Sequence, residues 1–224
     1  MTPDLSVRLE SVAGFISPGA KRVIDVGSDH GLLGIALLKR SVAEKVVCTD
    51  INKGPADRSR LALNMAGFKS CSEVFNTDGL KGVSLMPEDY VVIAGMGGLN
   101  IIDILKQAKE DNPDEVFKSV TFVLQPQKSL DLVRLYLSEN GFEIVDERAC
   151  TDKGFHYQVM KVIYSGKPYE LSLREQFYGP VLIRRFEEGD EEVEGLFEHL
   201  TKIYKVRARG DERIARCLEE DHES

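Results

Sequence analysis

The sequence predicts an α/β fold, in which helices flank a mostly parallel sheet, with a small helical extension at the C-terminal end. Three observations support this fold class. Apolar runs at residues 23–26, 90–94 and 120–124, the first interrupted by Asp25 and the last by Thr121, are typical of buried parallel strands. Small, polar or glycine-containing turns follow these runs, and apolar residues then return at helical spacing. After residue 171 only helical spacing remains, and 224 residues are enough for one α/β domain with such an extension.

The composition is that of an ordinary globular protein, with 42% hydrophobic and 29% charged residues. The net charge of −8 disfavours nucleic-acid binding through the field of the whole molecule and leaves that role to local basic patches. The four cysteines form no Cys-x-x-Cys pair, so we expect neither a zinc site nor a disulfide framework. No apolar run has the length of a membrane span and the first residues do not resemble a signal peptide, so we expect a cytoplasmic protein that binds no membrane and no metal.

Apolar residues near helical spacing between residues 5 and 16 predict a first helix that packs at the edge of the sheet. Ser17-Pro18-Gly19 ends this helix. Arg8 lies on the helix, and its charge fits two roles equally well: a solvent-exposed side chain or a contact to substrate phosphates.

The turn after the first strand reads Asp-Val-Gly-Ser-Asp-His-Gly over residues 25–31. Ligands of open α/β sheets bind beyond the carboxyl ends of the strands, so we expect the chemistry at this loop. A dinucleotide site has glycine where this sequence has Asp25, and a carboxylate there disfavours a pyrophosphate. A ligand with a cationic amino group and a ribose suits it better. Asp-x-Gly-x-x-x-Gly is typical of S-adenosylmethionine (SAM) enzymes, although structural turns also contain Asp and Gly.

Two further acids follow the next strands. A second strand at residues 45–50 ends in Asp50, which follows Gly31 by about the 20 residues at which an acid holds a ribose hydroxyl in nucleotide-binding α/β units. Asp78 and Gly79 come after a short third strand. An Asp-Gly pair at the end of a strand usually forms only a turn. Because Asp25 and Asp50 precede it, we interpret Asp78 as an adenine contact.

The fourth strand, at residues 90–94, is followed by Gly95-Met96-Gly97-Gly98. Glycine lets the backbone approach a ligand closely and adopt positive φ. A tight turn between a strand and a helix needs one glycine or two, so three in four residues favour a ligand site. Met96 is expected either to stack against a substrate base or to lie in the core.

The rest of the chain completes the sheet and adds helices. Gln125 follows the fifth strand and either reads a base edge, lines the pocket or is a polar loop residue. His156 is expected to be a structural histidine. The chain divides into a SAM-binding domain at residues 1–166 and a helical, coiled-coil-like domain at residues 167–224. In chain order we expect helices at 32–38, 56–65, 99–105 and 129–137, antiparallel strands at 142–148 and 158–164, and helices that begin near Ser172, Pro180 and Val193.

Five motifs stand in order: Ile-Asp-Val-Gly-Ser-Asp-His at 24–30, Lys-Gly-Pro at 53–55, Thr-Asp-Gly-Leu at 77–80, Ile-Ala-Gly-Met-Gly-Gly at 93–98 and Leu-Gln-Pro-Gln at 124–127. Together they resemble the bacterial TrmK family over nearly the whole chain. The resemblance implies a Rossmann-like class I SAM methyltransferase with a C-terminal coiled-coil pair, acting on N1 of adenosine 22 in the D arm of tRNA. Two stretches depart from the family. Residues 31–34 read Gly-Leu-Leu-Gly instead of Ala-Tyr-Leu-Pro, and Asp50-Ile51 replaces Glu-Val.

The motifs and the resemblance together assign the site residues. The methyl group of SAM is activated on a sulfonium and adenine N1 carries a lone pair, so alignment should supply most of the catalysis. Asp29 is the first candidate to orient N6 or accept its proton and His30 the second, while Asp29 is equally suited to cap a helix. The expected cofactor contacts are Asp25, Gly27, Ser28, Asp50, Ile51, Asp78, Gly79, Ala94, Gly95, Met96, Gly97 and Gly98. The expected substrate contacts are Arg8, Lys53, Arg58, Gln125, Lys202, Lys205, Arg207 and Arg209.

Other functions share these features. A SAM-dependent methyltransferase for another RNA or for a small molecule has the same need for Asp25, Asp50 and Asp78. A non-catalytic SAM-binding or RNA-binding protein has no need for Asp29. A nicotinamide oxidoreductase is disfavoured because Asp25 replaces a glycine of its motif. Oligomeric state and tRNA species are not decided by the sequence.

Overall fold

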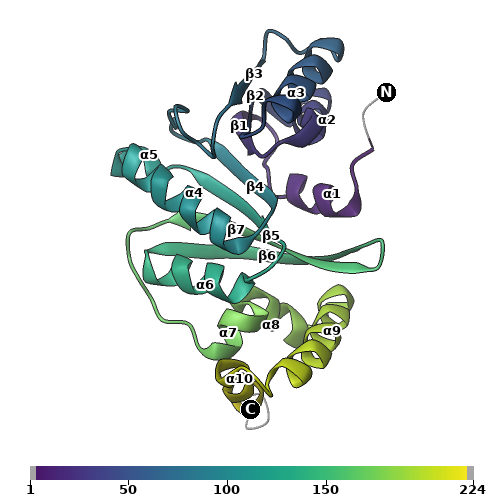
Figure 1. Ribbon diagram of the computed structural model, residues 1–224, viewed down its shortest axis with the longest axis vertical. Helices are drawn as coiled ribbons and strands as arrows, with labels where there is room; N and C mark the ends of the chain where they lie inside the picture. The colour runs from purple at the N-terminus through teal and green to yellow at the C-terminus, as the bar shows by residue number, and fades with distance from the viewer. Residues whose placement is uncertain (1–3, 221–224) are drawn as a thin grey trace.

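The computed structural model describes residues 4–220. Within that range the chain forms a seven-stranded mixed sheet in the order β3-β2-β1-β4-β5-β7-β6 (Figure 1). The strands β1 to β5 are parallel, whereas β7 is antiparallel to β5 and β6 is antiparallel to β7. The strands are β1 (Ala20–Val26), β2 (Ala43–Asp50), β3 (Ser72–Asn76), β4 (Tyr90–Met96), β5 (Thr121–Pro126), β6 (Phe142–Asp152) and β7 (Phe155–Tyr164).

Helices cover both faces of the sheet, and each face has its own core. On one face, α1, α2 and α3 pack over a cluster that includes Val23 and Val92. On the other, α4, α5 and α6 pack over a cluster that includes Ile24 and Ile93. Because neighbouring residues of a strand point to opposite faces, a strand buried on both faces is apolar throughout. These helices are α1 (Val7–Ala13), α2 (Leu32–Lys39), α3 (Lys53–Met65), α4 (Gly98–Asp111), α5 (Asp114–Phe117) and α6 (Leu130–Glu139).

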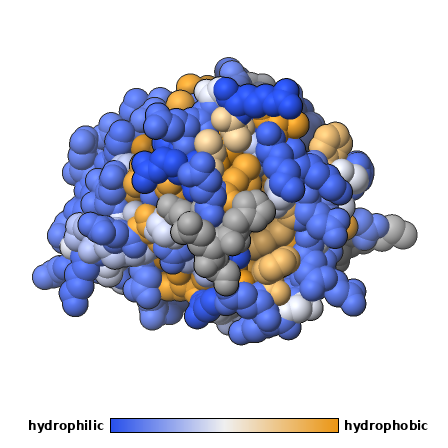
Figure 2. Space-filling model, turned by 90° about the horizontal axis from the view of Figure 1, so that it is seen from below, coloured by the Kyte–Doolittle hydropathy of each residue, from blue (hydrophilic) through white to orange (hydrophobic). Residues whose placement is uncertain are grey.

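The C-terminal helices form a third core beside β6. They are α7 (Leu173–Tyr178), α8 (Pro180–Glu187), α9 (Glu191–Arg207) and α10 (Glu212–Glu220). The capping box at the start of α7 is present: Ser172 Oγ accepts from the Glu175 backbone N–H at 3.2 Å, and Glu175 Oε2 accepts from the Ser172 N–H at 2.8 Å. Seen from this end of the molecule, hydrophobic side chains gather in a central band framed by hydrophilic ones (Figure 2).

The predicted α/β fold class and the C-terminal helices are confirmed. α5 and α10 are absent from the sequence prediction. α5 is a single turn, whereas α10 places Ile214, Cys217 and Leu218 at helical spacing, a signal strong enough to predict it. The division at residue 166 stays a prediction. None of the helices within residues 4–220 is long and apolar enough to cross a membrane.

Candidate active site

A cavity of about 610 Å³ opens at the carboxyl ends of β1, β2 and β4. It lies where the strand order reverses, because β1 pairs with β2 on one side and with β4 on the other. Ligands of open α/β sheets bind at this position, and the volume suits a small-molecule cofactor. The lining residues are Val26, Gly27, Thr49, Asp50, Ile51, Asn52, Thr77, Asp78, Gly79, Leu80, Lys81, Ala94, Gly95, Met96, Asn100, Asp103, Ile104 and Gln107.

Asp50 and Asp78 both line the cavity, as the strand-end motifs predict. Asp50 is buried at the end of β2, and its Oδ1 accepts the Asn52 backbone N–H at 2.8 Å. The second carboxylate oxygen of Asp50 has no protein partner among the described hydrogen bonds. Asp78 is exposed and pairs with Lys81 at 3.3 Å. The buried acid therefore holds a fixed orientation, while the exposed acid can move.

The loop after β1 lies directly against the β2 end. The backbone N–H groups of Gly27 and Ser28 both donate to Thr49 O, at 2.8 and 3.1 Å. Gly27 has a φ of +72°, and a Cβ there would lie 2.3 Å from Met96 Cε. The positive φ favours glycine at this turn, and the absence of a side chain lets the end of the Met96 side chain lie against the loop. Ser28 does not line the cavity, because its hydroxyl lies behind the loop at 3.2 Å from Ser59 Oγ.

Asp25 is buried in β1, one residue before the cavity lining. It is the register partner of Cys48, and burial raises the pKa of this carboxyl to about 7. Burial also raises the pKa of the Cys48 thiol, and the charge of Asp25 adds to that rise. A cationic ligand group nearby would favour the charged carboxylate. The predicted contact of Asp25 with the cofactor stays a prediction, since Asp25 does not itself line the cavity.

Raising the pH is expected to destabilise the ligand-free protein through Asp25. This carboxyl has a pKa of 3.8 as its ordinary value and about 7 when folded, so between these values the folded state binds more protons than the unfolded state. The free energy of unfolding therefore falls as the pH rises across this window, by at most about 4 kcal/mol. Asp25→Asn removes the ionisation, so urea unfolding between about pH 4 and about pH 8 should show a smaller decline in the variant. Equal declines in the two proteins would contradict this.

The glycine run serves three different purposes. Gly95 has a φ of +79° and sits at an irregularity in the pairing of β4 with β5, between Ala94 and Met96. Gly97 is the N-cap residue of α4 and does not line the cavity. Gly98 has no space for a side chain, because a Cβ would lie 2.7 Å from Lys128 O and 2.8 Å from Ser129 O. Of the three glycines, Gly95 lines the cavity with a positive φ, and Gly98 allows α4 to pack closely against the backbone at Lys128 and Ser129.

Gln125 holds the backbone of the glycine run in place through a hydrogen bond to Gly95. Its side chain is fully buried at the end of β5. Gln125 Oε1 accepts the Gly95 backbone N–H at 3.1 Å and Arg8 Nη1 at 2.8 Å, and its Nε2 donates to Pro126 O at 3.0 Å. The carboxamide therefore fixes the irregular turn at Gly95. The sequence left two roles open for Arg8, a solvent-exposed side chain or a contact to substrate phosphates. Its guanidinium lies at the edge of the site, bound to Gln125, and the phosphate contact stays a prediction.

Asp29 and His30 lie on the rim, outside the cavity lining. Both side chains are more than half exposed, and Asp29 Oδ1 lies 3.6 Å from His30 Nε2 and 3.3 Å from Arg58 Nη2. The alternative role of Asp29 as a helix cap is wrong, because Gly31 is the N-cap residue of α2 and no side chain caps that helix. Asp29 is thus available on the surface, with Arg58 as its cationic neighbour.

The predicted basic contacts fall into two places. Arg8, Arg58 and Lys53 surround the carboxyl ends of the strands, with Lys53 paired to Asp57. The second group is exposed on α9 and just after it, and α9 packs beside β6 at the far edge of the sheet from β3 (Figure 1). It comprises Lys202, which pairs with Glu198, and Lys205, Arg207 and Arg209. The structure does not bring this second group to the cavity.

One wall of the cavity is absent from the sequence prediction. It is a face of α4 with Asn100, Asp103, Ile104 and Gln107 at helical spacing. Three polar residues on one face, directly after the glycine run, were the available signal. Among the buried side-chain polar atoms of residues 4–220, only Thr49 Oγ1 lacks a hydrogen-bond partner, and Thr49 lines the cavity. A polar ligand in the cavity would supply that partner.

Comparisons with known proteins agree with this geometry. Residues 5–160 match the family model described as a methyltransferase domain. A protein of Mycoplasma genitalium named "Putative tRNA methyltransferase MG248" is 33% identical over 184 residues, 79% of this chain and 78% of that protein. The tRNA (adenine(22)-N(1))-methyltransferase of Bacillus subtilis is 30% identical over 156 residues, 70% of this chain and 63% of that enzyme.

Solved structures extend the similarity to almost the whole chain. The crystal structure of the B. subtilis m1A22 tRNA methyltransferase TrmK has a TM-score of 0.76 and 25% identity, covering 97% of this chain and 94% of that one. Streptococcus pneumoniae Sp1610 in complex with SAM has a TM-score of 0.78 and 27% identity, covering 96% and 97%. The chain belongs to the methyltransferase domain family and, within it, to the TrmK family of tRNA methyltransferases.

Proposed function

We propose that the protein transfers the methyl group of SAM to N1 of adenosine 22 in the D arm of tRNA. The observation that carries this proposal is the cavity at the reversal of strand order, with Asp50 and Asp78 at neighbouring strand ends. The B. subtilis relative is named for this reaction, and the S. pneumoniae relative binds SAM.

The cavity residues fit this cofactor. The free oxygen of Asp50 is an acceptor for ribose hydroxyls, and Thr49 Oγ1 needs a partner. The apolar side chain of Ile51 is largely exposed beside Asp78, which suits the two faces and the polar edge of an adenine. Gly27, Gly95 and Met96 line the end of the cavity towards the glycine run, where the reacting methyl group belongs. SAM supplies a methyl group that needs no further activation.

The residues of the chain then have two tasks, which are to align adenine N1 with the methyl group and to accept the proton that leaves N6. Adenine N1 attacks with its ring-plane lone pair, so no base is required before transfer, and in-line geometry supplies most of the rate. The methylated base is cationic until a proton leaves N6. We assign the acceptance of that proton to Asp29, with His30 beside it as the second candidate. Phosphate contacts by Arg8, Lys53 and Arg58 would hold the RNA and weaken as salt increases.

Methyl transfer from labelled SAM to an unmodified tRNA transcript tests the proposal. Nuclease digestion and mass spectrometry should find 1-methyladenosine at position 22, and a transcript with guanosine there should remain unmethylated. Methylation at another nucleotide would support another RNA target. SAM binding without transfer to any tRNA would favour a small-molecule substrate or a non-catalytic role.

A further inference from the structure

The β6–β7 ribbon extends beyond the rest of the sheet at the cavity side. β5 pairs with β7 only as far as Leu124 opposite Met160, whereas β6 and β7 remain paired to Asp152 opposite Phe155 (Figure 1). Because β7 is antiparallel to β5, its first residues project past the carboxyl end of β5. The turn residues Lys153 and Gly154 both have positive φ, at 52° and 80°, as in a type I′ turn. The two strands of the ribbon are therefore joined at the tip by a tight two-residue turn.

Phe155 stands at this tip with 67% of its surface exposed. An aromatic side chain so exposed gains little from burial in the fold. Tyr157 is two residues further along β7, so both rings lie on the same face of the strand. The guanidinium of Arg8 lies over the Tyr157 ring, 5.8 Å from its centroid. His156 points to the other face, where its ring lies 4.7 Å from that of His199 on α9.

Arg8 links this aromatic face to the cavity. Its backbone N–H donates to Asp152 Oδ2 at 3.3 Å, at the tip of the ribbon. Its side chain reaches the buried Gln125, which also holds the Gly95 N–H. The tip and the cavity edge are thus separated by about the length of one arginine side chain. Arg8 and Tyr157 lie between Phe155 and the cavity edge.

We propose that Phe155 and Tyr157 are a stacking platform for the nucleobases that flank the target adenosine of the RNA substrate. This inference rests on the proposed function. N1 lies on the pairing edge of adenine, so the base must leave the helix before it can react, and its neighbours lose stacking. Aromatic side chains restore that stacking with any base, and Arg8 adds a cation near the backbone phosphates. The position of the platform on the cavity side of the sheet, joined to the cavity edge through Arg8, favours unstacked RNA over another protein as its occupant.

The test compares Phe155→Ala, Phe155→Tyr and wild type on an unmodified tRNA transcript. Phe155→Ala should lower kcat/KM for tRNA about 5- to 100-fold and weaken tRNA binding in a filter assay, because one base loses its stacking partner. Phe155→Tyr should retain most of the wild-type value. The affinity for SAM, measured by calorimetry, should be unchanged in both variants, since Phe155 does not line the cavity.

Met65→Ala is the matched control. Met65 is 80% exposed on α3, so its truncation also removes an exposed apolar side chain and should leave tRNA methylation unchanged. Wild-type kcat/KM and wild-type tRNA binding in Phe155→Ala would overturn the platform while leaving the proposed function intact. A wild-type protein that methylates no tRNA but binds it through Phe155 would overturn the proposed function alone.

Discussion

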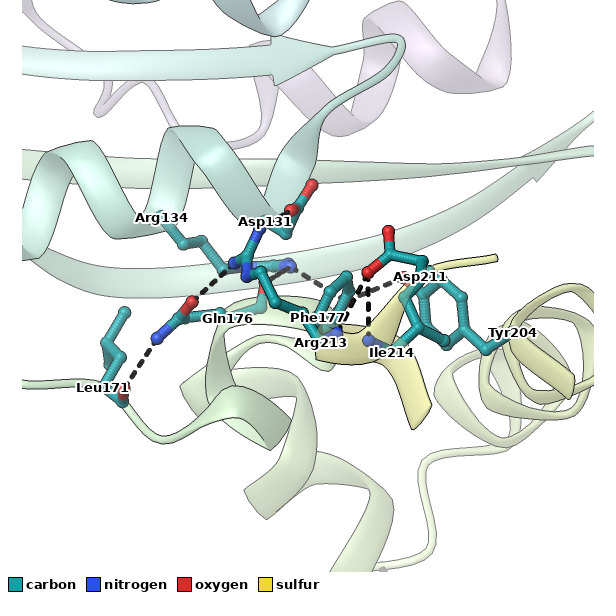
Figure 3. Close-up of polar contacts among 9 residues, drawn as sticks. All are labelled: Asp131, Arg134, Leu171, Gln176, Phe177, Tyr204, Asp211, Arg213 and Ile214. Carbon is teal, nitrogen blue, oxygen red and sulfur yellow. Dashed lines mark hydrogen bonds and ion pairs between the residues drawn. The ribbon is translucent and has the colours of Figure 1, made fainter. Parts of the chain in front are cut away.

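Replacing Arg134 with methionine is expected to destabilise the folded protein by about 3–5 kcal/mol, the cost of leaving a buried charge without its partner. Arg134 on α6 and Glu147 on β6 are both fully buried, and their ion pair is 2.9 Å long. The guanidinium also donates to the backbone carbonyls of Gln176 and Phe177 at the end of α7 (Figure 3). Its removal therefore deprives the Glu147 carboxylate, two backbone carbonyl groups and Gln158 Oε1 of this donor at the junction of the sheet with the C-terminal helices.

Urea unfolding at neutral pH measures this effect. Arg184→Met is the control, because Arg184 is exposed on α8, and we expect a change of no more than about 0.5 kcal/mol. The double variant Arg134→Met/Glu147→Leu should lose less stability than Arg134→Met alone, since it leaves no buried charge unpaired. A loss in Arg134→Met no larger than in the control would show that the pair does not hold the helices in place.

A second arginine strengthens the same junction. Arg213 on α10 donates to Asp131 on α6 at 3.0 Å and to Gln176 Oε1 at 2.8 Å, and its guanidinium lies 5.2 Å from the Phe177 ring centroid (Figure 3). Gln176 in turn donates to Leu171 O at 2.8 Å. The start and the end of the C-terminal helices are therefore both tied to the α6 side of the sheet by polar contacts. Such contacts fix orientation, which matters if the basic residues of α9 are to meet one region of the RNA.

The cavity residues that the sequence predicts are those set by local pattern. Asp50 is the last residue of β2 and Asp78 comes two residues after the end of β3, and the ends of neighbouring parallel strands meet at one edge. The side-chain alternation of a strand and the length of the turn then suffice to place them. The same logic works for Gly95, whose position near the end of β4 needs no knowledge of the rest of the fold.

Other residues depend on packing between distant elements, which no local pattern contains. Gln125 lies near the end of a strand as Asp50 does, yet its carboxamide is fully buried and accepts hydrogen bonds from Arg8 and Gly95. Gly98 looks like part of a ligand loop, but the backbone at Lys128 requires it. Which face of α4 lines the cavity likewise depends on how that helix packs on the sheet. Sequence spacing predicts that a face exists, and only the assembled core decides where it points.

Asp50→Ala is expected to weaken SAM binding about 10- to 100-fold. A hydrogen bond to a charged group contributes about 1.5–3 kcal/mol, and each 1.4 kcal/mol is a tenfold change in affinity. The carboxylate has one oxygen committed to the Asn52 N–H and one that we assign to the ribose of the cofactor. Calorimetric titration with SAM measures the change. Glu73→Ala is the control, because Glu73 is an exposed acid on the adjacent strand β3 and pairs with Lys45 on the surface.

Asp50→Asn separates the two duties of this side chain. Its amide oxygen can still accept the Asn52 N–H, so the loop keeps its shape while the charge is lost. If ribose binding depends on the charge, Asp50→Asn should bind SAM nearly as weakly as Asp50→Ala. If the asparagine variant binds like wild type, Asp50 acts by shaping the loop. Wild-type affinity in both variants would remove Asp50 from the cofactor site and leave Asp78, which follows the neighbouring strand, as the acid to examine for ribose contact.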